Sequence, residues 1–271
     1  MGANDVSVDH DVSVDSDQFV LLERRDSVAH LQLNRPAQFN ALSSDMMSAL
    51  QSMLDSLAND ESVRVVVIGA AGKAFCAGHD LREMSAHPAL AFYQALFAQC
   101  SRLMMTIQAM PKPVVARVHG LATAAGCQLV AMCDLAVAAS DARFAVSGVN
   151  LGLFCATPSV ALARNLSRKK AFEMLVTGEF VSAEEALRDG LVNRVVAPDQ
   201  LDRCVDQLCT RIASKPAVAI AMGKGLFYKQ LEMGITAAYQ LAGQTMACNM
   251  VEPAAQEGTL AFLEKRQPNW G

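Results

Sequence analysis

One segment, residues 114–135, limits the possible folds more than any other part of this chain. It begins with the run VVARV, which is rich in β-branched residues, passes Gly120 and the mostly small residues LATAA, and enters an apolar stretch at Gly126. This order predicts a buried strand, a tight loop and the first turns of a helix. Small side chains let a ligand approach the loop backbone, and the first N–H groups of a helix have no partner inside it. The segment therefore predicts a site for an anion or a developing oxyanion.

A second segment, earlier in the chain, repeats this layout. Residues 63–69, VRVVVIG, predict a buried strand, and residues 70–79 form a loop rich in glycine and alanine. If the two loops face each other, each contributes a backbone N–H to the same oxygen. Such a pair of donors stabilises an enolate or a tetrahedral intermediate.

Strand and helix patterns alternate over residues 19–138, and helical patterns continue to residue 265. This repetition predicts an α/β fold, with a spiral of sheet strands and helices on the outside. The C-terminal helical segments are rich in Ala, Met and Leu, so we expect them to need a partner surface.

Composition excludes several classes of protein. With 271 residues and 52% apolar content, the chain forms one large domain or one domain with an appendage. A net charge of −4 without a basic stripe argues against a nucleic-acid partner. The longest apolar stretch, residues 120–133, is too short to span a membrane. No HExxH, nucleotide phosphate loop or CxxC pair occurs, so we expect no metal site and eight reduced, mostly buried cysteines.

The first residues of the chain differ in character from the rest. Residues 1–17 are acidic and lack large apolar side chains, which predicts a disordered tail. They are neither Arg-rich like a mitochondrial presequence nor apolar like a secretory signal, so the expected location is cytoplasmic.

Six segments occur in an order and spacing that resemble a known family. They are LNRPAQFNAL (33–42), KAFCAGHDLREM (73–84), KPVVARVHGLATAAGCQLVAMCDLAVA (112–138), ARF (142–144), VTGEFVSAEEALRDGLVNRVV (176–196) and AFLEKRQPNW (261–270). Over residues 19–270 the chain resembles the enoyl-CoA hydratase/isomerase (crotonase) superfamily. Within it, the motifs GHDL, AAGCQLVA and GLFCATP are most similar to the subgroup called enoyl-CoA hydratase domain-containing protein 3.

The resemblance implies a fold, a ligand and an assembly. It implies a crotonase (ClpP-like) spiral of ββα units over residues 18–200 and a helical region over residues 201–271. The helical region would form a homotrimer, and two trimers would stack into a hexamer. The ligand would be an acyl-CoA thioester of fatty acid metabolism, with coenzyme A as part of the substrate and no separate cofactor or metal.

The resemblance also implies site residues. The backbone N–H groups of His79 and Ala125 would bind the thioester carbonyl, and the segment His79, Asp80, Leu81 and Arg82 would lie along the acyl-CoA. Phe262 and Lys265 would touch the CoA of a neighbouring subunit. Simpler roles remain open: core packing for Phe262, a solvated helix end for Lys265, a surface salt bridge for Arg82, and packing for the His79 side chain.

Two residues depart from the family pattern. Family hydratases add water with two glutamates, and this chain has Gln128 and Gly148 at those positions. An amide has no titrating proton and glycine has no side chain, so neither replaces a general base. No Asp or Glu occurs in residues 84–133 or 142–172. Asp80 and Asp134 are expected to hold loops rather than to act as catalysts.

These residues predict an acyl-CoA-binding protein of this family for which efficient hydration is doubtful. One alternative is base-independent thioester chemistry, such as decarboxylation, or less favourably thioester hydrolysis. Another is a non-catalytic acyl-CoA-binding oligomer. The thiols of Cys127, Cys133 and Cys155 are expected to be inert in their apolar surroundings. A protease of the same fold would need a serine where Gly126 and Cys127 stand.

Overall fold

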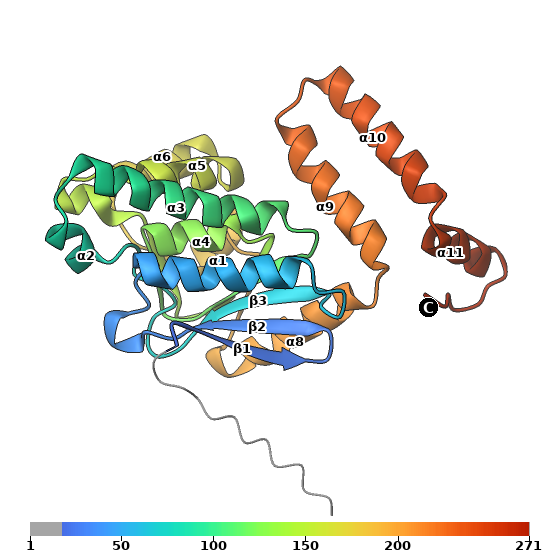
Figure 1. Ribbon diagram of the computed structural model, residues 1–271, viewed down its shortest axis with the longest axis horizontal. Helices are drawn as coiled ribbons and strands as arrows, with labels where there is room; N and C mark the ends of the chain where they lie inside the picture. The colour runs from blue at the N-terminus through green and yellow to red at the C-terminus, as the bar shows by residue number, and fades with distance from the viewer. Residues whose placement is uncertain (1–17, 271) are drawn as a thin grey trace, which may run out of the picture.

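A six-stranded, mostly parallel sheet forms the centre of the computed structural model, which describes residues 18–270 (Figure 1). The strand order is β1-β2-β3-β4-β6-β9, and only the edge pair β1–β2 is antiparallel. The strands are β1 (Val20–Arg25), β2 (Val28–Leu33), β3 (Val65–Ala70), β4 (Val114–Val118), β6 (Leu135–Ala139) and β9 (Arg194–Val196). The acidic tail predicted for residues 1–17 lies outside the described residues.

Burial along the strands follows their place in the sheet. All six residues of β3, VVVIGA, are buried, as expected for a parallel strand covered on both faces. At the edge, β1 leaves four of its six residues exposed. Ile68 of β3 lies between Leu31 of β2 and Ala116 of β4 in the register. The β-branched runs identified in the sequence therefore form the middle of the sheet.

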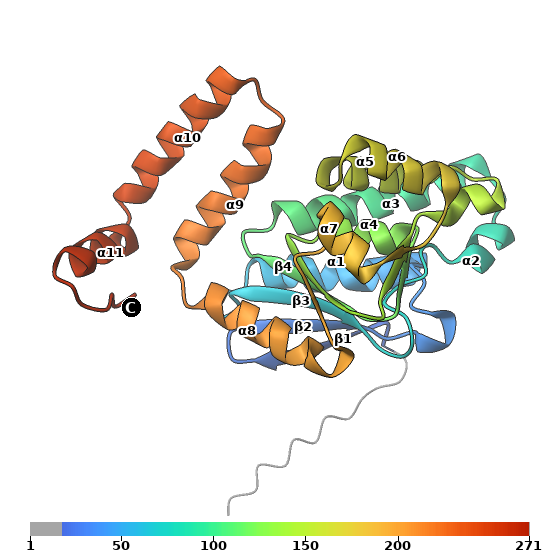
Figure 2. The same ribbon diagram turned by 180° about the vertical axis from the view of Figure 1, so that it is seen from behind.

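Helices cover both faces of this sheet (Figures 1 and 2). One face is covered by α1 (Ser44–Ala58), α3 (Leu90–Ala109) and α4 (Ala125–Met132). The other face is covered by α8 (Leu201–Ala213), whose Leu201, Val205 and Cys209 pack against valines of β3 and β4. Helix α1 begins after Ser43, whose hydroxyl caps it by accepting a hydrogen bond from the Met46 N–H at 3.2 Å.

A smaller sheet lies next to α4 and holds its first turn in place. It consists of β5 (Leu121–Thr123), β7 (Arg143–Ala145) and β8 (Val181–Ser182). The remaining helices of the core are α2 (Leu81–Ala86), α5 (Ala156–Asn165), α6 (Arg168–Thr177), α7 (Ala183–Asp189), and the 3-10 turns η1 (Pro36–Gln38), η2 (Ser147–Leu151) and η3 (Pro198–Gln200).

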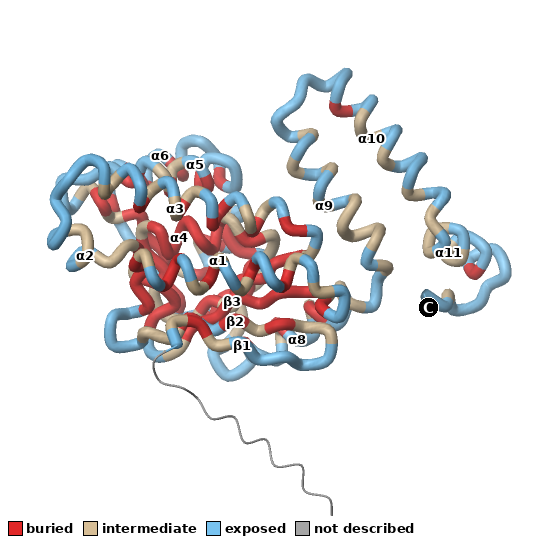
Figure 3. The backbone as a smooth tube through the Cα atoms, in the orientation of Figure 1, coloured by how far each residue is buried: buried red, intermediate tan, exposed pale blue. Residues whose placement is uncertain are grey.

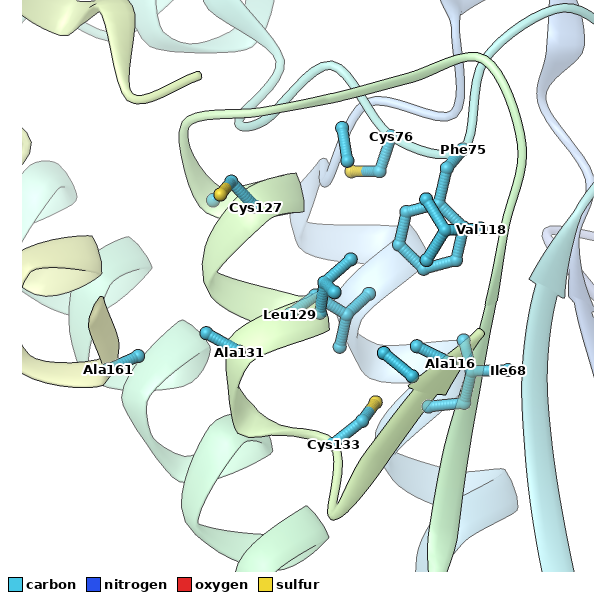
Figure 4. Packing of buried hydrophobic residues seen from close by; sticks show 14 of the residues in the cluster. Ile68, Phe75, Cys76, Ala116, Val118, Cys127, Leu129, Ala131, Cys133 and Ala161 are labelled. Atoms are coloured by element: carbon cyan, nitrogen blue, oxygen red, sulfur yellow. The ribbon is translucent and has the colours of Figure 1, made fainter. Parts of the chain in front are cut away.

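Helix α4 is buried on all sides except at its last residue. Residues 125–131 are all buried, and Leu129 lies in the core with Phe75 and Val118 (Figure 4). A helix that is apolar all round fits only the interior of a domain. The loop before α4 is therefore fixed by packing on every side.

The last three helices extend away from the core as an arm, which we define as α9 (Ala217–Leu231), α10 (Ile235–Met250) and α11 (Pro253–Leu263) (Figures 1 and 3). Helix α9 has no buried residue, and α10 and α11 each have one. Phe227, Ile235 and Phe262 are 56%, 74% and 81% exposed. The division into a core of residues 18–200 and an assembly region of residues 201–271 remains a prediction.

A cluster of polar side chains anchors the arm to the core. Lys224 of α9 donates hydrogen bonds to a carboxylate oxygen of Asp134 at 2.6 Å and to the Ile107 carbonyl at 2.8 Å. Tyr228 donates to the other oxygen of Asp134 at 2.8 Å, and the Val114 N–H donates to the first at 2.6 Å. The Asp134 carboxylate is thus bound from three sides in a structural role.

Candidate functional site

The two loops identified in the sequence lie side by side in the structure. The Cys76 N–H donates to the Leu121 carbonyl at 3.0 Å, and the Thr123 N–H donates to the Cys76 carbonyl at 2.9 Å. The first loop therefore runs beside β5 and parallel to it, with a β-bridge between Cys76 and Ala122. Because the loop continues to His79 and β5 leads into α4, the two candidate donors are brought to the same place.

Two backbone N–H groups at this place are unpaired. Within residues 18–270, neither the His79 nor the Ala125 N–H donates a hydrogen bond. A Cβ placed on Gly78, the residue before His79, would lie 3.3 Å from the Ala125 nitrogen. The backbone therefore carries two free donors close together, one of them at a helix N-terminus. This arrangement is suited to an oxygen that carries or develops negative charge.

The close approach of the loops depends on glycine at two positions. A Cβ on Gly78 would lie 2.8 Å from the Ala124 Cβ, and one on Gly126 would lie 2.2 Å from the Cys76 carbonyl oxygen. Gly78 also has a φ of 95°, which L residues rarely adopt. Glycine is therefore required both for the loop conformation and for the contact.

Ala124, directly before α4, has a strained backbone. Its φ of 50° and ψ of −119° are disfavoured for a residue with a Cβ. Hydrogen bonds hold it there: its N–H donates to Ala145 at 2.9 Å and its carbonyl accepts from the Gln128 N–H at 3.0 Å. This conformation sets the direction of the following N–H, that of Ala125.

Gln128 lies in the first turn of α4 and is 4% exposed. Its Oε1 is buried and has no hydrogen-bond partner within the described part of the chain. Helical side chains lean toward the helix N-terminus, so the amide points back toward Ala125. A buried acceptor without a partner is costly, and its presence beside two free donors indicates a place where a ligand binds.

Gly148 has no space for a side chain. It lies in η2, where a Cβ would be 2.3 Å from the Leu153 carbonyl oxygen and 2.7 Å from the Cys155 sulfur. The Gly148 N–H also donates to that sulfur at 3.3 Å. Sequence reasoning identified the missing carboxylate at Gly148, but no signal in the sequence indicated that Leu153 and Cys155 fill its place.

The His79 side chain packs at the edge of the site. Its Nδ1 lies 3.3 Å from the Leu42 carbonyl oxygen, and its ring contacts Phe97 edge-on with centroids 5.4 Å apart. Its Nε2 is buried and has no hydrogen-bond partner among residues 18–270. Burial lowers the pKa of His79, outweighing the Leu42 carbonyl and Glu83, which raise it. The imidazole is therefore neutral at pH 7, and its Nδ1 carries the hydrogen because a carbonyl can only accept.

The residues after His79 form a short helix that the sequence analysis missed. Asp80 caps α2 by accepting the Arg82 N–H at 3.0 Å, and its carboxylate lies 3.7 Å from the Arg35 guanidinium. The signal was present in the sequence, because Asp80 and Glu83 have the spacing of a capping box. Leu81 is 53% exposed and Arg82 is exposed, so both are free to contact a ligand.

The other predicted ligand contacts lie elsewhere in the chain. Phe262 and Lys265 belong to the end of the arm, which both views place away from α4 (Figures 1 and 2). A single chain therefore does not bring them to the two free N–H groups. Their contact with the CoA of a neighbouring subunit remains a prediction.

The thiols near the site are not nucleophiles at neutral pH. Burial raises the pKa of Cys76 and of Cys127 to about 12. Burial also raises the pKa of Cys155, although the Gly148 N–H opposes the shift.

A cavity of about 440 Å³ lies at the base of the arm, lined among others by Arg64, Lys112 and Ile220. Arg64 donates to the Lys215 carbonyl and Lys112 to the Leu57 carbonyl, so the cations that line it are already paired. Among residues 18–270, no group of His, Cys, Asp and Glu could hold a metal ion, and no helix has the length and hydropathy to cross a membrane.

Comparison with known proteins identifies relatives along almost the whole chain. A sequence model described as Enoyl-CoA hydratase/isomerase matches residues 23–271. Enoyl-CoA hydratase domain-containing protein 3, mitochondrial, from Rattus norvegicus is 46% identical over 247 residues, which cover 91% of this chain and 82% of the rat protein.

Solved structures agree with this similarity. The crystal structure of an enoyl-CoA hydratase from Mycobacterium smegmatis is 62% identical with a TM-score of 0.92, covering 93% of this chain and 98% of that one. Human enoyl-CoA hydratase domain-containing protein 3 is 44% identical with a TM-score of 0.91, covering 93% and 100%. The α/β crotonase fold predicted from the sequence is confirmed.

One prediction is wrong. The sequence analysis placed the protein in the cytoplasm, whereas the similar proteins from rat, mouse, Xenopus laevis and human are all named as mitochondrial. The prediction relied on the lack of a recognisable targeting pattern in residues 1–17, and such a lack does not specify a compartment.

Proposed function

The chain belongs to the enoyl-CoA hydratase/isomerase family, and on this premise we propose that it binds an acyl-CoA thioester through two backbone N–H groups without hydrating it efficiently. The two donors are those of His79 and Ala125. Leu81 and Arg82, which follow His79 on α2, extend this site along the acyl-CoA.

The unpaired N–H groups carry this proposal. They belong to neighbouring loops, and the backbone at Gly78 approaches Ala125 so closely that a Cβ would lie 3.3 Å from its nitrogen. A thioester carbonyl accepts two hydrogen bonds, and a bond at a helix N-terminus strengthens when the oxygen gains charge. The free donors therefore match a carbonyl that becomes an enolate.

The side chains around these donors do not support hydration. Gln128 cannot take a proton from water, and Gly148 is so enclosed that no carboxylate could be placed there without moving Leu153. The carboxylates nearest in sequence are engaged, Asp80 in capping α2 and Glu83 in accepting the Ser44 N–H at 3.0 Å. A reaction at this site would have to proceed without a general base of this kind.

Two activities are compatible with such a site. In one, the oxyanion donors assist a reaction that generates its own enolate, such as loss of CO2 from a malonyl-type thioester. In the other, the protein binds acyl-CoA and does not turn it over. The neutral His79 and the protonated thiols of Cys76 and Cys127 favour the second.

We further propose that the protein works as a homotrimer or as a hexamer of two trimers. The arm of a single chain leaves large apolar side chains exposed, among them Ile235, Tyr239 and Met246 at 74%, 74% and 70%. Surfaces of this kind are buried in assemblies. Such an assembly would bring Phe262 and Lys265 to a neighbouring subunit's CoA.

Calorimetric titration with butyryl-CoA and free CoA, together with a crotonyl-CoA hydration assay, tests the proposal. We expect the thioester to bind more tightly than free CoA and hydration to be negligible. A hydration rate within about tenfold of that of a relative with both glutamates would refute the claim about hydration. If the thioester bound no better than CoA, the claim about the oxyanion donors would fall.

A panel of acyl-CoA esters separates the two activities. Consumption of a malonyl-type thioester, with release of CO2, would establish the enzyme. If every ester raises the melting temperature and none is consumed, binding without turnover is the better account.

A further inference from the structure

A buried amide side chain holds the loop that carries one of the two free donors. Asn40 is fully buried, and its Nδ2 donates hydrogen bonds to the carbonyls of Ala71 and Ala74, both at 2.8 Å. These two carbonyls lie at the start of the first loop, residues 70–79, and His79 is its last residue. Both amide hydrogens of Asn40 are therefore used to fix the start of this loop.

The position of the Asn40 side chain is itself fixed by a closed turn. The Asn40 N–H donates to the Arg35 carbonyl at 3.0 Å, and the Arg35 N–H donates to Asn40 Oδ1 at 2.8 Å. The φ of Asn40 is 53°, in the left-handed region that asparagine adopts more readily than most residues with a Cβ. One residue thus closes the turn with its backbone and its side chain, and reaches the first loop from it.

The segment directly after Asn40 pairs with the end of the same loop. The Leu42 N–H donates to the Gly78 carbonyl at 2.7 Å, and the Leu42 carbonyl accepts the Asp80 N–H at 3.4 Å. These two bonds form a parallel bridge between Leu42 and His79. In such a bridge a residue bonds to both neighbours of its partner, so the partner's own N–H points away from it. The pairing with Leu42 therefore sets the direction of the His79 N–H.

Other side chains hold the first loop from the side of the second loop. His119 Nε2 lies 2.9 Å from the Gly72 carbonyl oxygen, and the Thr123 hydroxyl donates to the Ala77 carbonyl at 3.0 Å. These contacts keep the two loops together. If the hydrogen bonds of Asn40 are lost, we therefore expect the first loop to turn in place rather than to detach.

Resting on the function proposed above, we infer that Asn40 is a positioning residue for the oxyanion donor of His79. Its side chain holds the start of the loop, and the segment that it begins holds the end. A hydrogen bond weakens steeply when the donor turns away from the acceptor. A small rotation of the loop therefore reduces the affinity for the thioester carbonyl and leaves the affinity for the CoA portion unchanged.

The variant Asn40→Gly tests this inference, because glycine keeps the left-handed backbone without strain and removes the side-chain hydrogen bonds. The full-length protein and the variant are titrated calorimetrically with butyryl-CoA and with free CoA. We expect the variant to bind butyryl-CoA at least about tenfold more weakly than the wild type, and to bind free CoA within about twofold of it.

Infrared spectroscopy of the bound thioester separates positioning from a general loosening of the structure. Butyryl-CoA with an isotope label at its carbonyl carbon reports how strongly hydrogen bonds polarise that carbonyl, because polarisation lowers its stretching frequency. We expect a lower frequency on the wild-type protein than in water. At saturation Asn40→Gly should lose about half of this shift, since one of the two donors is misdirected.

Asn165→Gly is the matched control. The Asn165 side chain also donates to two backbone carbonyls, those of Ala131 and Ala161, both at 2.9 Å. Ala131 lies near the C-terminal end of α4, whereas Ala125 is its first residue. This variant should keep the preference for butyryl-CoA over free CoA and the full frequency shift.

A milder replacement keeps the inference testable if Asn40→Gly does not fold. Asn40→Ser retains one hydroxyl donor, so we expect a smaller loss of butyryl-CoA affinity and of frequency shift, again with free CoA unaffected. Loss of the fold in both variants would show that Asn40 supports the whole core and would overturn its role as a positioning residue.

The remaining outcomes separate this inference from the function on which it rests. If Asn40→Gly binds butyryl-CoA as the wild type does, with an unchanged frequency shift, the inference is wrong. If the variant binds butyryl-CoA and free CoA equally more weakly and keeps the shift, Asn40 has a structural role and the inference is also wrong. If the wild type binds butyryl-CoA no better than free CoA, the proposed function itself fails.

Discussion

At the scale of single residues, Gly78 decides how closely the two donors approach each other. Its φ is 95°, and a Cβ there would meet the Ala124 Cβ at 2.8 Å and the Thr123 carbonyl oxygen at 3.2 Å. Backbone N–H groups are not removed by ordinary side-chain replacement, so displacing the loops is the direct way to test them.

We expect Gly78→Ala to weaken acyl-CoA binding by at least about tenfold, because the added methyl pushes the His79 N–H away from Ala125. Gly152→Ala is the matched control. Gly152 has a φ of 76°, but no atom of the described part of the chain lies within 4 Å of its Cβ position. The control should lose about 1 kcal/mol of stability from backbone strain alone and bind normally. Equal binding by the two variants, measured by calorimetry, would argue against the paired donors.

The His79 side chain makes stability depend on pH. Burial lowers its pKa below the ordinary 6.5, so below that pH the unfolded chain binds more protons than the folded one. Folding stability due to His79 is therefore present above pH 6.5 and falls as the pH drops toward the folded-state pKa. We expect His79→Gln to flatten the decrease in melting temperature between about pH 6.5 and 5, relative to wild type.

The exposed His87 provides the control for this measurement. It follows the last residue of α2, where its exposed ring stacks on Phe92 and its Nδ1 lies 3.1 Å from the Glu83 carbonyl oxygen. The decrease in melting temperature of His87→Gln should match that of the wild type. A decrease for His79→Gln as steep as that of the wild type would mean that His79 is not held neutral by burial.

At the scale of the elements, the anchor between the arm and the core is unusual because it is polar. Lys224 and Asp134 have side chains that are 7% and 12% exposed, on an arm helix that has no buried residue. Burial lowers the pKa of Lys224, whereas Asp134 raises it. Asp134 lies two residues after the end of α4, and its carboxylate accepts a hydrogen bond from the N–H of Val114, the first residue of β4. Asp134 thereby connects α9 of the arm to β4, the strand that leads into the second loop of the site.

We expect Lys224→Met to reduce the free energy of unfolding by about 3 kcal/mol, because it leaves the Asp134 carboxylate buried without its cation. Lys229→Met, on the exposed part of the same helix, should change it by less than about 0.5 kcal/mol. The double variant Asp134→Asn with Lys224→Met should lose less than the sum of the single changes. Additive losses in urea titrations would show that the two side chains do not interact.

The long elements could be predicted from the sequence, and the short ones could not. Buried apolar residues recur at helical spacing in α1 and α3, and the valine run of residues 63–69 predicts β3. The strands β5, β7 and β8 have two or three residues each, which is too few for any periodicity. They form because they pair with one another and with the loop at Cys76, and such contacts are tertiary.

In the candidate site, too, local features could be predicted from the sequence and tertiary contacts could not. The glycine-rich loops predicted where the two N–H donors would be, because tight loops and helix starts are local features. Leu153 and Cys155 fill the space around Gly148 because the segment between η2 and α5 packs against that residue. Gln128 Oε1 is unpaired because no hydrogen-bond donor of residues 18–270 lies within reach of it. That is a feature of the tertiary structure, so no sequence pattern predicts it.

At the scale of the whole molecule, the arm has a surface that a single chain does not cover. Four large side chains of α10 are between 49% and 74% exposed and lie on one face of the helix, since their spacings of four, seven and four residues are whole helical turns. They are Ile235, Tyr239, Met246 and Met250. A continuous apolar stripe on an extended helix is suited to packing against another protein surface, which here we propose is another copy of the chain.

We expect the wild-type protein to have a solution mass three or six times its chain mass of 29.0 kDa. Met246→Asp places a charge in the α10 stripe, so it should shift the mass toward a single chain at the same protein concentration. Gln244→Asp adds the same charge on the opposite side of the helix and should leave the assembly intact. Light scattering distinguishes these states. A wild-type mass of one chain would refute the assembly, and dissociation by Gln244→Asp alone would place the interface on the other face of α10.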